Sequence, residues 1–278
     1  MSEFSDLISA ERPLVLLGCG NMGKALLAGW LGQGLPREHI FIVDPFVAER
    51  GLPDLDIGEE QCASRTLADM IASVLVLAVK PQIFDDAAAS VAGACDGETI
   101  GLSIMAGTSI ETISAALPEL GGVVRTMPNT PAAVGKGVTG LFAQPSVSED
   151  ARALCETLLG AVGATVWVPQ ESDLNAVTAL SGSGPAYVFH MIECLTLAGE
   201  QQGLSQEVAQ TLAIETVRGA GVLAATAVDT PTQLRVKVTS PGGTTQAGLD
   251  VLMKEGSGLE PLISQTVAAA KARAEELG

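Results

Sequence analysis

A glycine-rich segment placed directly after the first apolar run constrains the fold of this chain more than any other feature. Residues 14–17 are apolar, residues 18–23 read Gly-Cys-Gly-Asn-Met-Gly, and residues 21–31 have a helical pattern. In such a segment the first glycine allows a tight turn, the second lets the backbone approach a pyrophosphate, and the third lets the helix pack against the sheet. The start of the helix adds amide groups and partial positive charge. We therefore expect a dinucleotide site at Gly18, Gly20, Asn21, Met22 and Gly23.

The first 168 residues alternate between short apolar runs and helical stretches. The expected strands are 14–17, 39–43, 74–79, 99–104, 122–126, 138–142 and 164–168, and the expected helices between them include 81–94 and 109–117. Strands that alternate with helices predict a mainly parallel sheet, here a doubly wound one of the Rossmann type.

The pattern changes near residue 169. Beyond it no strand pattern remains, and helical stretches cover 173–180, 185–202, 205–228, 231–238, 244–254 and 259–277. At about 150 residues per domain, a chain of 278 residues predicts two domains. We expect an α/β domain over residues 1–168 and an all-helical domain over residues 169–278.

The charge balance excludes several kinds of partner. The chain has 15 Lys and Arg against 32 Asp and Glu, a net charge of −17, which repels the phosphates of nucleic acids and disfavours a polybasic membrane anchor. No apolar stretch reaches the ~18 residues of a membrane span, and the first residues lack the basic region of a signal peptide. The five cysteines are odd in number and form no zinc pattern, so we expect small buried side chains, no metal and a cytoplasmic location.

The preference between NAD and NADP stays open at this point. Asp44 follows the last glycine of the motif by about 20 residues, as the fingerprint expects, and would favour NAD by binding the ribose hydroxyls. Arg50 and Arg65 lie nearby in the sequence and could instead bind a 2′-phosphate, although both are equally expected as ordinary surface arginines.

The second half of the chain has few groups for acid–base chemistry. The whole chain has two His, His39 and His190, and one Tyr. Tyr187 is followed four residues later by Met191 rather than Lys, and His190 is expected in the core of an apolar helix. Polar Gly-rich segments at 181–185 and 239–245 instead open helices, where hydroxyl and amide groups suit a carboxylate ligand. A cyclic imine with a carboxylate fits this composition, since a protonated C=N bond accepts hydride without a strong base.

Five segments together resemble the pyrroline-5-carboxylate reductase family. They are Gly18–Gly23, Ala78-Val79-Lys80-Pro81, Met127-Pro128-Asn129-Thr130-Pro131, Leu180–Tyr187 and Thr239–Thr245. The likeness runs from residue 13 to nearly the last residue, and LSGSGPAY and VTSPGGTT are its most specific parts. It implies reduction of 1-pyrroline-5-carboxylate to L-proline, the last step of proline biosynthesis. It also implies NADPH as cofactor, with NADH possible, and a helical domain that forms homodimers or larger assemblies.

The resemblance also implies roles for individual residues. Cofactor contacts fall on Asp44, Ala78, Val79, Lys80, Pro81, Met105, Ala106, Gly107 and Asn129, with Thr130 near the nicotinamide. The backbone of Gly243 and Thr244 would hold the substrate carboxylate, and the Thr245 hydroxyl would face the ring nitrogen as proton donor. Ser240 and Glu171 would line the same site.

The chain departs from the family pattern at two positions. Asp44 stands where many members have a small or amide residue near the 2′-phosphate, and Val228 stands where some have a glutamate. Two other functions fit the same layout less well. A β-hydroxyacid dehydrogenase relative would need a lysine base, but lysines after residue 171 occur only at 237, 254 and 271. A dinucleotide-binding regulator without turnover would not need the hydroxyls of Ser240 and Thr245.

Overall fold

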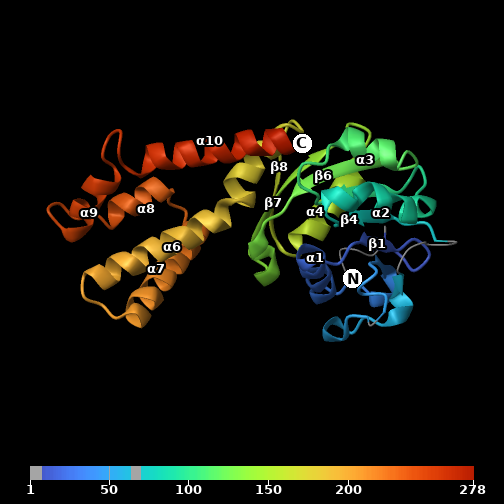
Figure 1. The fold of residues 1–278 in the computed structure, drawn as a ribbon, viewed down its shortest axis with the longest axis horizontal. Helices are drawn as coiled ribbons and strands as arrows, with labels where there is room; N and C mark the ends of the chain where they lie inside the picture. The colour runs from blue at the N-terminus through green and yellow to red at the C-terminus, as the bar shows by residue number, and fades with distance from the viewer. Residues whose placement is uncertain (1–7, 50, 64–69) are drawn as a thin grey trace. The chain divides into compact units, whose positions relative to one another are not determined.

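The structure, a computed structural model, describes residues 8–49, 51–63 and 70–278 (Figure 1). Arg50 and Arg65, the two arginines considered for a 2′-phosphate, lie outside these ranges. The chain divides into two compact units. The first consists of Met1–Gly182 with Lys271–Gly278, and the second is Ser183–Ala270.

The first unit contains one sheet, whose described strands follow the order β3-β2-β1-β4-β5-β6-β7-β8. The strands are β1 (Leu14–Leu17), β2 (Ile40–Val43), β3 (Cys62–Ala63), β4 (Val74–Leu77), β5 (Ile100–Ser103), β6 (Gly122–Met127), β7 (Gly137–Ala143) and β8 (Gly163–Trp167). All neighbours pair in parallel except β6 and β7, which are antiparallel. From β1 the chain builds β2 and β3 on one side of that strand, and it then crosses to the other side of β1, where it forms β4. In open α/β sheets ligands bind at the carboxyl ends of the strands where the order reverses, which in this sheet are β1 and β4.

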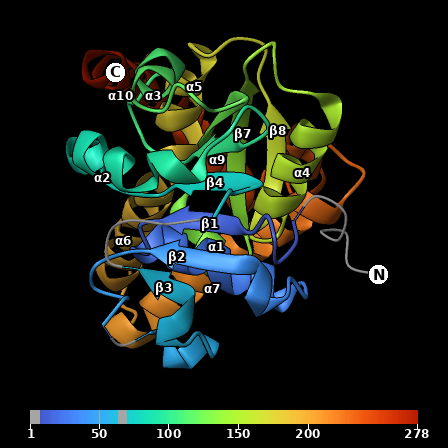
Figure 2. The ribbon, with the colours of Figure 1, turned by 90° about the vertical axis from the view of Figure 1, so that its right-hand side faces the viewer.

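Helices cover both faces of this sheet, which explains why its central strands are apolar throughout (Figure 2). The helices of the first unit are α1 (Asn21–Gly32), α2 (Phe84–Val91), α3 (Ile110–Ala116), α4 (Glu149–Gly160) and α5 (Asp173–Val177). Side chains of α1 and α4 pack in one apolar cluster with Leu14 and Leu16 of β1. Side chains of α2 and α3 pack in a second cluster with Val15 and Leu17 of the same strand. The doubly wound α/β fold predicted from the sequence is confirmed.

Several details differ from the sequence expectation for local physical reasons. The helix expected over 81–94 begins and ends with short 3₁₀ segments, Pro81–Ile83 and Ala92–Ala94, around α2. The helix expected over 173–180 ends at Val177 and continues as a π-helical turn over Thr178–Gly182. Such turns are rare and often occur at functional sites. The short strand β3 was not predicted, because two residues carry no periodic signal.

The second unit is helical. It contains α6 (Gly184–Gln201), α7 (Gln206–Thr226), α8 (Pro231–Lys237) and α9 (Thr244–Leu252), and most of α10 (Leu259–Leu277). Ser205 caps α7 by accepting from the Val208 amide, and Thr230 with Gln233 forms a capping box on α8. Within Ser183–Ala270 only Ala209 and Ala213 are buried. In the part of the chain that is described, no helix is long and apolar enough to cross a bilayer.

Candidate active site

The predicted cofactor residues of the first unit meet at one edge of the sheet. Gly18 follows β1, Asp44 follows β2, Ala78 follows β4, Met105 lies two residues after β5, and Asn129 lies two residues after β6. These five strands run in parallel, so the segments after them lie at a common edge. This is the edge where ligands bind in open α/β sheets.

The glycine loop is held in its turn by contacts that exclude side chains. Gly18 has φ +88°, a left-handed conformation, and a Cβ built on it would stand 2.8 Å from Val79 Cγ1. A Cβ on Gly23 would stand 2.6 Å from the Gly18 carbonyl oxygen, so α1 could not pack as closely with a larger residue. At Gly20, in contrast, a Cβ would meet nothing within 4 Å. The open space at Gly20 fits the approach of a pyrophosphate to the backbone.

At the start of α1 no side chain among the described residues neutralises the partial positive charge of the helix. Its N-cap residue is Gly20, no side chain caps the helix, and its first turn holds no acid. The first helical hydrogen bond runs from the Lys24 amide to the Gly20 carbonyl, so the amides of residues 21–23 precede the ladder. By comparison, Ser109 and Ser148 accept from amides at the starts of α3 and α4. The residues present therefore fit an anionic dinucleotide.

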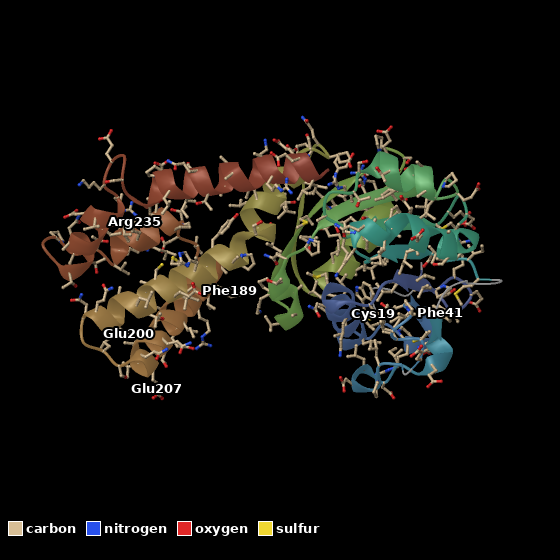
Figure 3. All side chains as sticks on the ribbon, in the orientation of Figure 1. Cys19, Phe41, Phe189, Glu200, Glu207 and Arg235 are labelled. Carbon is tan, nitrogen blue, oxygen red and sulfur yellow. The ribbon has the colours of Figure 1, made fainter. Side chains whose placement is uncertain are left out.

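Cys19 lies inside this loop (Figure 3). Burial raises the pKa of its thiol to about 12, and the nearby Asp44 carboxylate adds to this shift. The thiol is consequently neutral at physiological pH. It adds no negative charge beside the amides of the loop.

The segments after β4 and β5 lie against the glycine loop and against each other. The Ala78 amide donates to the Leu17 carbonyl at 2.8 Å, and the Ile104 amide donates to the Leu77 carbonyl at 3.1 Å. Lys80 is exposed at the carboxyl end of β4, immediately before the 3₁₀ segment that begins at Pro81. Gly107 has φ +72°, and a Cβ there would stand 2.9 Å from the Leu277 carbonyl oxygen at the end of α10.

Asn129 uses both ends of its buried carboxamide. Its Oδ1 accepts from the Val138 amide at 2.9 Å, and its Nδ2 donates to the Ser181 carbonyl at 3.0 Å. A Cβ on Gly182 would stand 2.7 Å from Met127 Cε, so the π-helical turn packs closely on the end of β6. Two motifs that the sequence presents separately, Met127–Pro131 and Leu180–Tyr187, are thus joined through Asn129.

Glu171 is engaged by neighbouring groups of the first unit. Its Oε1 accepts from the Ile110 amide at the start of α3 and from Arg125 Nη1 on β6, both at 2.9 Å. The Arg125 side chain is only 11% exposed. These contacts tie α3 to β6 beside the Met105–Gly107 turn. The predicted contact of Glu171 with substrate stays a prediction.

The remaining predicted residues lie in the second unit, between α8 and α9. The Gly243 amide donates to the Ser240 carbonyl at 3.0 Å, and a Cβ on Gly243 would stand 2.6 Å from Ser240 Oγ. Gly243 is the N-cap of α9, no side chain caps the helix, and its first turn holds no acid. Thr244 and Thr245 are exposed in this first turn. The loop therefore offers amides and hydroxyls to a small anion in the same way as the start of α1.

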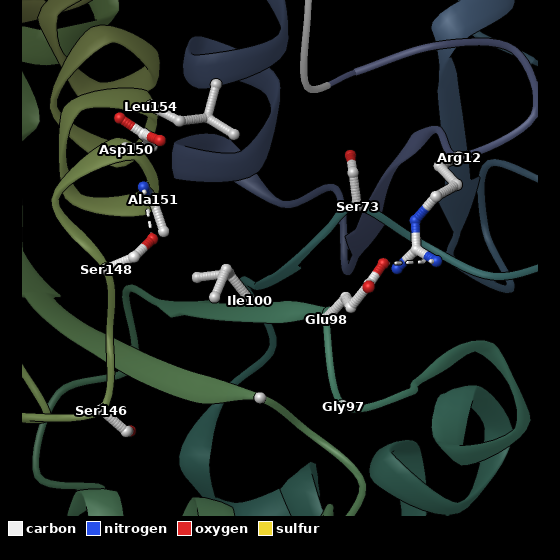
Figure 4. Close-up of a pocket in the computed structure, with 11 residues that line it drawn as sticks. Arg12, Ser73, Gly97, Glu98, Ile100, Ser146, Ser148, Asp150, Ala151 and Leu154 are labelled. Carbon is white, nitrogen blue, oxygen red and sulfur yellow. Dashed lines mark hydrogen bonds and ion pairs between the residues drawn. The ribbon is translucent and has the colours of Figure 1, made fainter.

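Two of three hollows in the described structure lie beside predicted site residues, and the third does not. One of about 590 Å³ lies beside α1 and includes Asn21, Met22 and Thr130. One of about 410 Å³ lies between α8 and α9 and includes Thr239. A third of about 510 Å³ lies at the amino-terminal ends of the parallel strands, where Arg12, Ser73 and Ile100 line it (Figure 4). This third hollow is at the edge opposite the glycine loop.

Two expectations about single side chains were wrong. His190 is exposed, with Nδ1 2.9 Å from Glu193 Oε2 and Nε2 3.7 Å from Cys194 Sγ, because the described residues leave its side of α6 open to solvent. Cys194 is likewise exposed, whereas Cys95 and Cys155 are buried as expected. Burial raises the pKa of these two buried thiols to about 11 and about 12. Among the described residues no group of three or more His, Cys, Asp or Glu could hold a metal ion.

Comparison with known proteins decides the family. The profile for pyrroline-5-carboxylate reductase dimerisation matches residues 171–277, and a profile for NADP oxidoreductase, coenzyme F420-dependent, matches residues 13–107. The pyrroline-5-carboxylate reductase of Pseudomonas aeruginosa is 39% identical over 267 residues, 95% of this chain and 96% of the relative. That of Synechocystis is 40% identical over 266 residues, 95% of this chain and 98% of the relative. This chain belongs to the pyrroline-5-carboxylate reductase family.

Solved structures of pyrroline-5-carboxylate reductases have the same fold. The Coxiella burnetii enzyme matches with a TM-score of 0.87 at 34% identity, over 96% of this chain and 99% of that one. The Plasmodium falciparum pyrroline carboxylate reductase, solved with NADP bound, matches with a TM-score of 0.77 at 25% identity, over 97% and 99%. The family prediction made from the five segments is confirmed, and with it the assignment to NAD(P)H-dependent oxidoreductases.

Proposed function

We propose that this chain reduces 1-pyrroline-5-carboxylate to L-proline with NADPH or NADH, the last step of proline biosynthesis. The observation that carries the proposal is that a chain of this family has two uncapped helix starts, α1 with its open Gly20 in the first unit and α9 with its Gly243 loop in the second. One suits a pyrophosphate and the other a small carboxylate. Neither feature requires a strong base.

The roles of the individual residues follow from this chemistry. Amides at Gly20 and in the first turn of α1 would hold the pyrophosphate, and the segments at Ala78–Pro81 and Met105–Gly107 would border the cofactor. The bound dinucleotide would supply the hydride. Amides of Gly243 and Thr244 would hold the substrate carboxylate, with Ser240 shaping the loop. The Thr245 hydroxyl would donate a proton to the ring nitrogen as the C=N bond becomes a C–N bond.

Two of the three lysines after residue 171 are paired with acids, which does not favour the alternative of a lysine base. Lys237 Nζ lies 2.5 Å from Asp229 Oδ2, and Lys271 Nζ lies 3.0 Å from Glu275 Oε1. A regulator without turnover is disfavoured by the intact Ser240 and Thr245 in a chain that belongs to a reductase family.

We also propose that residues 169–278 act as the substrate and dimerisation domain and residues 1–168 as the cofactor domain. The helices of Ser183–Ala270 leave many apolar side chains exposed, Phe189 and Leu212 among them. Figure 3 labels Phe189 on α6. A patch of this kind marks a protein interface. A second copy of the chain is the partner that a dimerisation profile over 171–277 favours. We place the reaction in the cytoplasm.

Turnover of the imine tests the proposal directly. Purified protein should oxidise NADPH or NADH when 1-pyrroline-5-carboxylate is added, with proline as the product by chromatography. Lack of turnover with both cofactors would overturn the proposed reaction.

A substitution tests the proton donor separately. Thr245→Ala should lower kcat by about 10²-fold while the dissociation constant of the cofactor changes little. Thr230→Ala, which removes a threonine that caps the neighbouring helix α8, serves as the control for loss of a hydroxyl. An unchanged kcat in Thr245→Ala would remove this residue as the donor.

A further inference from the structure

The carboxylate of Asp44 holds together the two loops that would surround the adenosine half of a dinucleotide. Its Oδ2 accepts from the Cys19 amide of the glycine loop at 2.8 Å. Its Oδ1 accepts from the amides of Phe46 and Val47, at 2.8 and 3.2 Å, in the turn after β2. The Gly18 amide donates to the Val43 carbonyl at 2.9 Å and completes the link.

As a result, the turn after β2 already binds an anionic group of the protein itself, the carboxylate of Asp44. Two adjacent amides that point at one oxygen form a small anion-binding concavity. In this chain the oxygen is Oδ1 of Asp44, so the amides of Phe46 and Val47 are already bonded. A phosphate group would have to displace the carboxylate to use them.

The remaining acceptor capacity of Asp44 suits a hydroxyl. An ionised carboxylate accepts about four hydrogen bonds, and three are made by the amides of Cys19, Phe46 and Val47. The fourth, on Oδ2, can take the 2′-hydroxyl of a ribose as donor. A 2′-phosphate has no such hydrogen, and its two negative charges would face the carboxylate at close range.

Two cations near the glycine loop and β2, Lys24 and Arg37, pair with acids other than Asp44. Lys24 Nζ lies 3.4 Å from Asp54 Oδ2, and Arg37 Nε lies 3.6 Å from Asp56 Oδ2. Neither is therefore committed to a phosphate beside Asp44.

We infer that Asp44 is the residue that sets the balance between the two cofactors, by accepting the ribose 2′-hydroxyl of NADH and disfavouring the 2′-phosphate of NADPH. The inference rests on the proposed use of a nicotinamide dinucleotide. Asp44 would then contact the cofactor and also connect the glycine loop to the turn after β2. Both cofactors remain usable, and the identity of residue 44 determines the ratio of the affinities for NADH and NADPH.

Binding of nucleotide fragments tests this without the reaction. Calorimetric titration of the full chain with 5′-AMP and with adenosine 2′,5′-bisphosphate compares a ribose hydroxyl with a 2′-phosphate. Asp44→Ser should raise the affinity for the bisphosphate relative to 5′-AMP by at least about tenfold, because one like-charge contact is removed. Asp44→Asn keeps one oxygen acceptor, enough for either the Cys19 amide or the amides of Phe46 and Val47, and should shift the ratio in the same direction. The ratio of kcat/KM for NADPH to that for NADH should rise in parallel.

Matched variants separate this effect from general charge and from loop damage. Glu49→Gln removes one negative charge from the same loop at an exposed position and should leave the affinity ratio unchanged. An unchanged ratio in both Asp44 variants, with folding intact by circular dichroism, would overturn the inference. So would a wild-type preference for the bisphosphate that is lost in Arg50→Ala or Arg65→Ala. Because the fragments contain no nicotinamide and need no imine, this failure is distinguishable from failure of the reductase activity.

Discussion

Asn129 Nδ2 donates to the Ser181 carbonyl oxygen at 3.0 Å, across 52 positions of the sequence. This bond connects the end of β6 to the π-helical turn that precedes α6. The same carboxamide accepts from the Val138 amide, and Asn129 is 8% exposed. A buried amide with both ends satisfied fixes two segments at once.

Asn129→Asp should therefore lower both stability and turnover. A carboxylate can still accept from the Val138 amide, but it cannot donate to Ser181, and two oxygens would face each other. We expect a loss of about 1–3 kcal/mol in the free energy of unfolding, measured by urea denaturation. Asn175→Asp, the same chemical change on α5, is the control and should cost less than Asn129→Asp. Equal losses in the two variants would contradict a special role for the Asn129 bond.

The sequence predicted the segments of the site better than their contacts. The glycine loop, the apolar strands and the change at about residue 169 depend on local patterns, and the structure contains the strands within a few residues of their expected bounds. The bonds from Asp44 to Cys19 and from Asn129 to Ser181 depend on which loops the sheet brings together. A local sequence pattern does not indicate which loops will meet in the folded sheet.

The second unit shows a different limit of sequence reasoning. Its helices are apolar enough to predict a core, and His190 was accordingly expected inside. The residues that the structure describes do not cover that surface, so His190 and Cys194 are exposed. An apolar helix face indicates that the face is buried, but the pattern does not tell whether the same chain or a partner buries it.

Two glycines of the loop should respond differently to alanine. Gly20→Ala places a methyl group in open space, so stability without ligand should change by less than about 0.5 kcal/mol. Dinucleotide affinity, measured by NADH fluorescence, should nevertheless fall by about tenfold or more, because the methyl group occupies the approach of the pyrophosphate.

Gly23→Ala is the counterpart. Its methyl group would stand 2.6 Å from the Gly18 carbonyl, so α1 must shift and the ligand-free protein should lose about 1–3 kcal/mol. If Gly20→Ala were the less stable variant, or if it bound NADH normally, the assignment of the two glycines would be wrong.

The ion pair between Arg12 and Asp96 should make stability depend on pH in the acid range. Hydrogen bonds from Arg12 hold the pKa of Asp96 well below its ordinary value of 3.8, and the Glu98 amide and Thr99 add to this effect. The unfolded chain therefore takes up a proton at higher pH than the folded one. The stabilisation is complete above the ordinary pKa and is lost as the pH falls through it toward the lower folded value.

Asp96→Asn should remove this dependence. Since the Asp96 side chain is 37% exposed, we expect only about 0.5–1 kcal/mol at neutral pH. The difference between the wild type and the variant should shrink between about pH 5 and pH 3, measured as urea midpoints over that range. Asp56→Asn, at a 90% exposed side chain, is the control. A difference that stays constant across the range would contradict the linkage to Asp96.

The exposed helices of the second unit should govern assembly. Leu212 on α7 is 53% exposed and Phe189 on α6 is 60% exposed, although both are apolar. If a second copy covers them, Leu212→Glu or Phe189→Glu buries a charge at the interface and should dissociate the assembly. Light scattering after gel filtration should then give the mass of one chain, 28.3 kDa, where the wild type gives at least twice that mass.

Val166→Glu provides the matched control, because Val166 on β8 in the first unit is 54% exposed and equally apolar. It should leave the mass of the assembly unchanged. The melting temperature of the wild type should also rise with protein concentration, because assembly stabilises the folded chain by mass action. In the Leu212→Glu variant this concentration dependence should vanish. A wild type that is monomeric, or variants that keep the assembled mass, would show that these helices are not covered by a second copy.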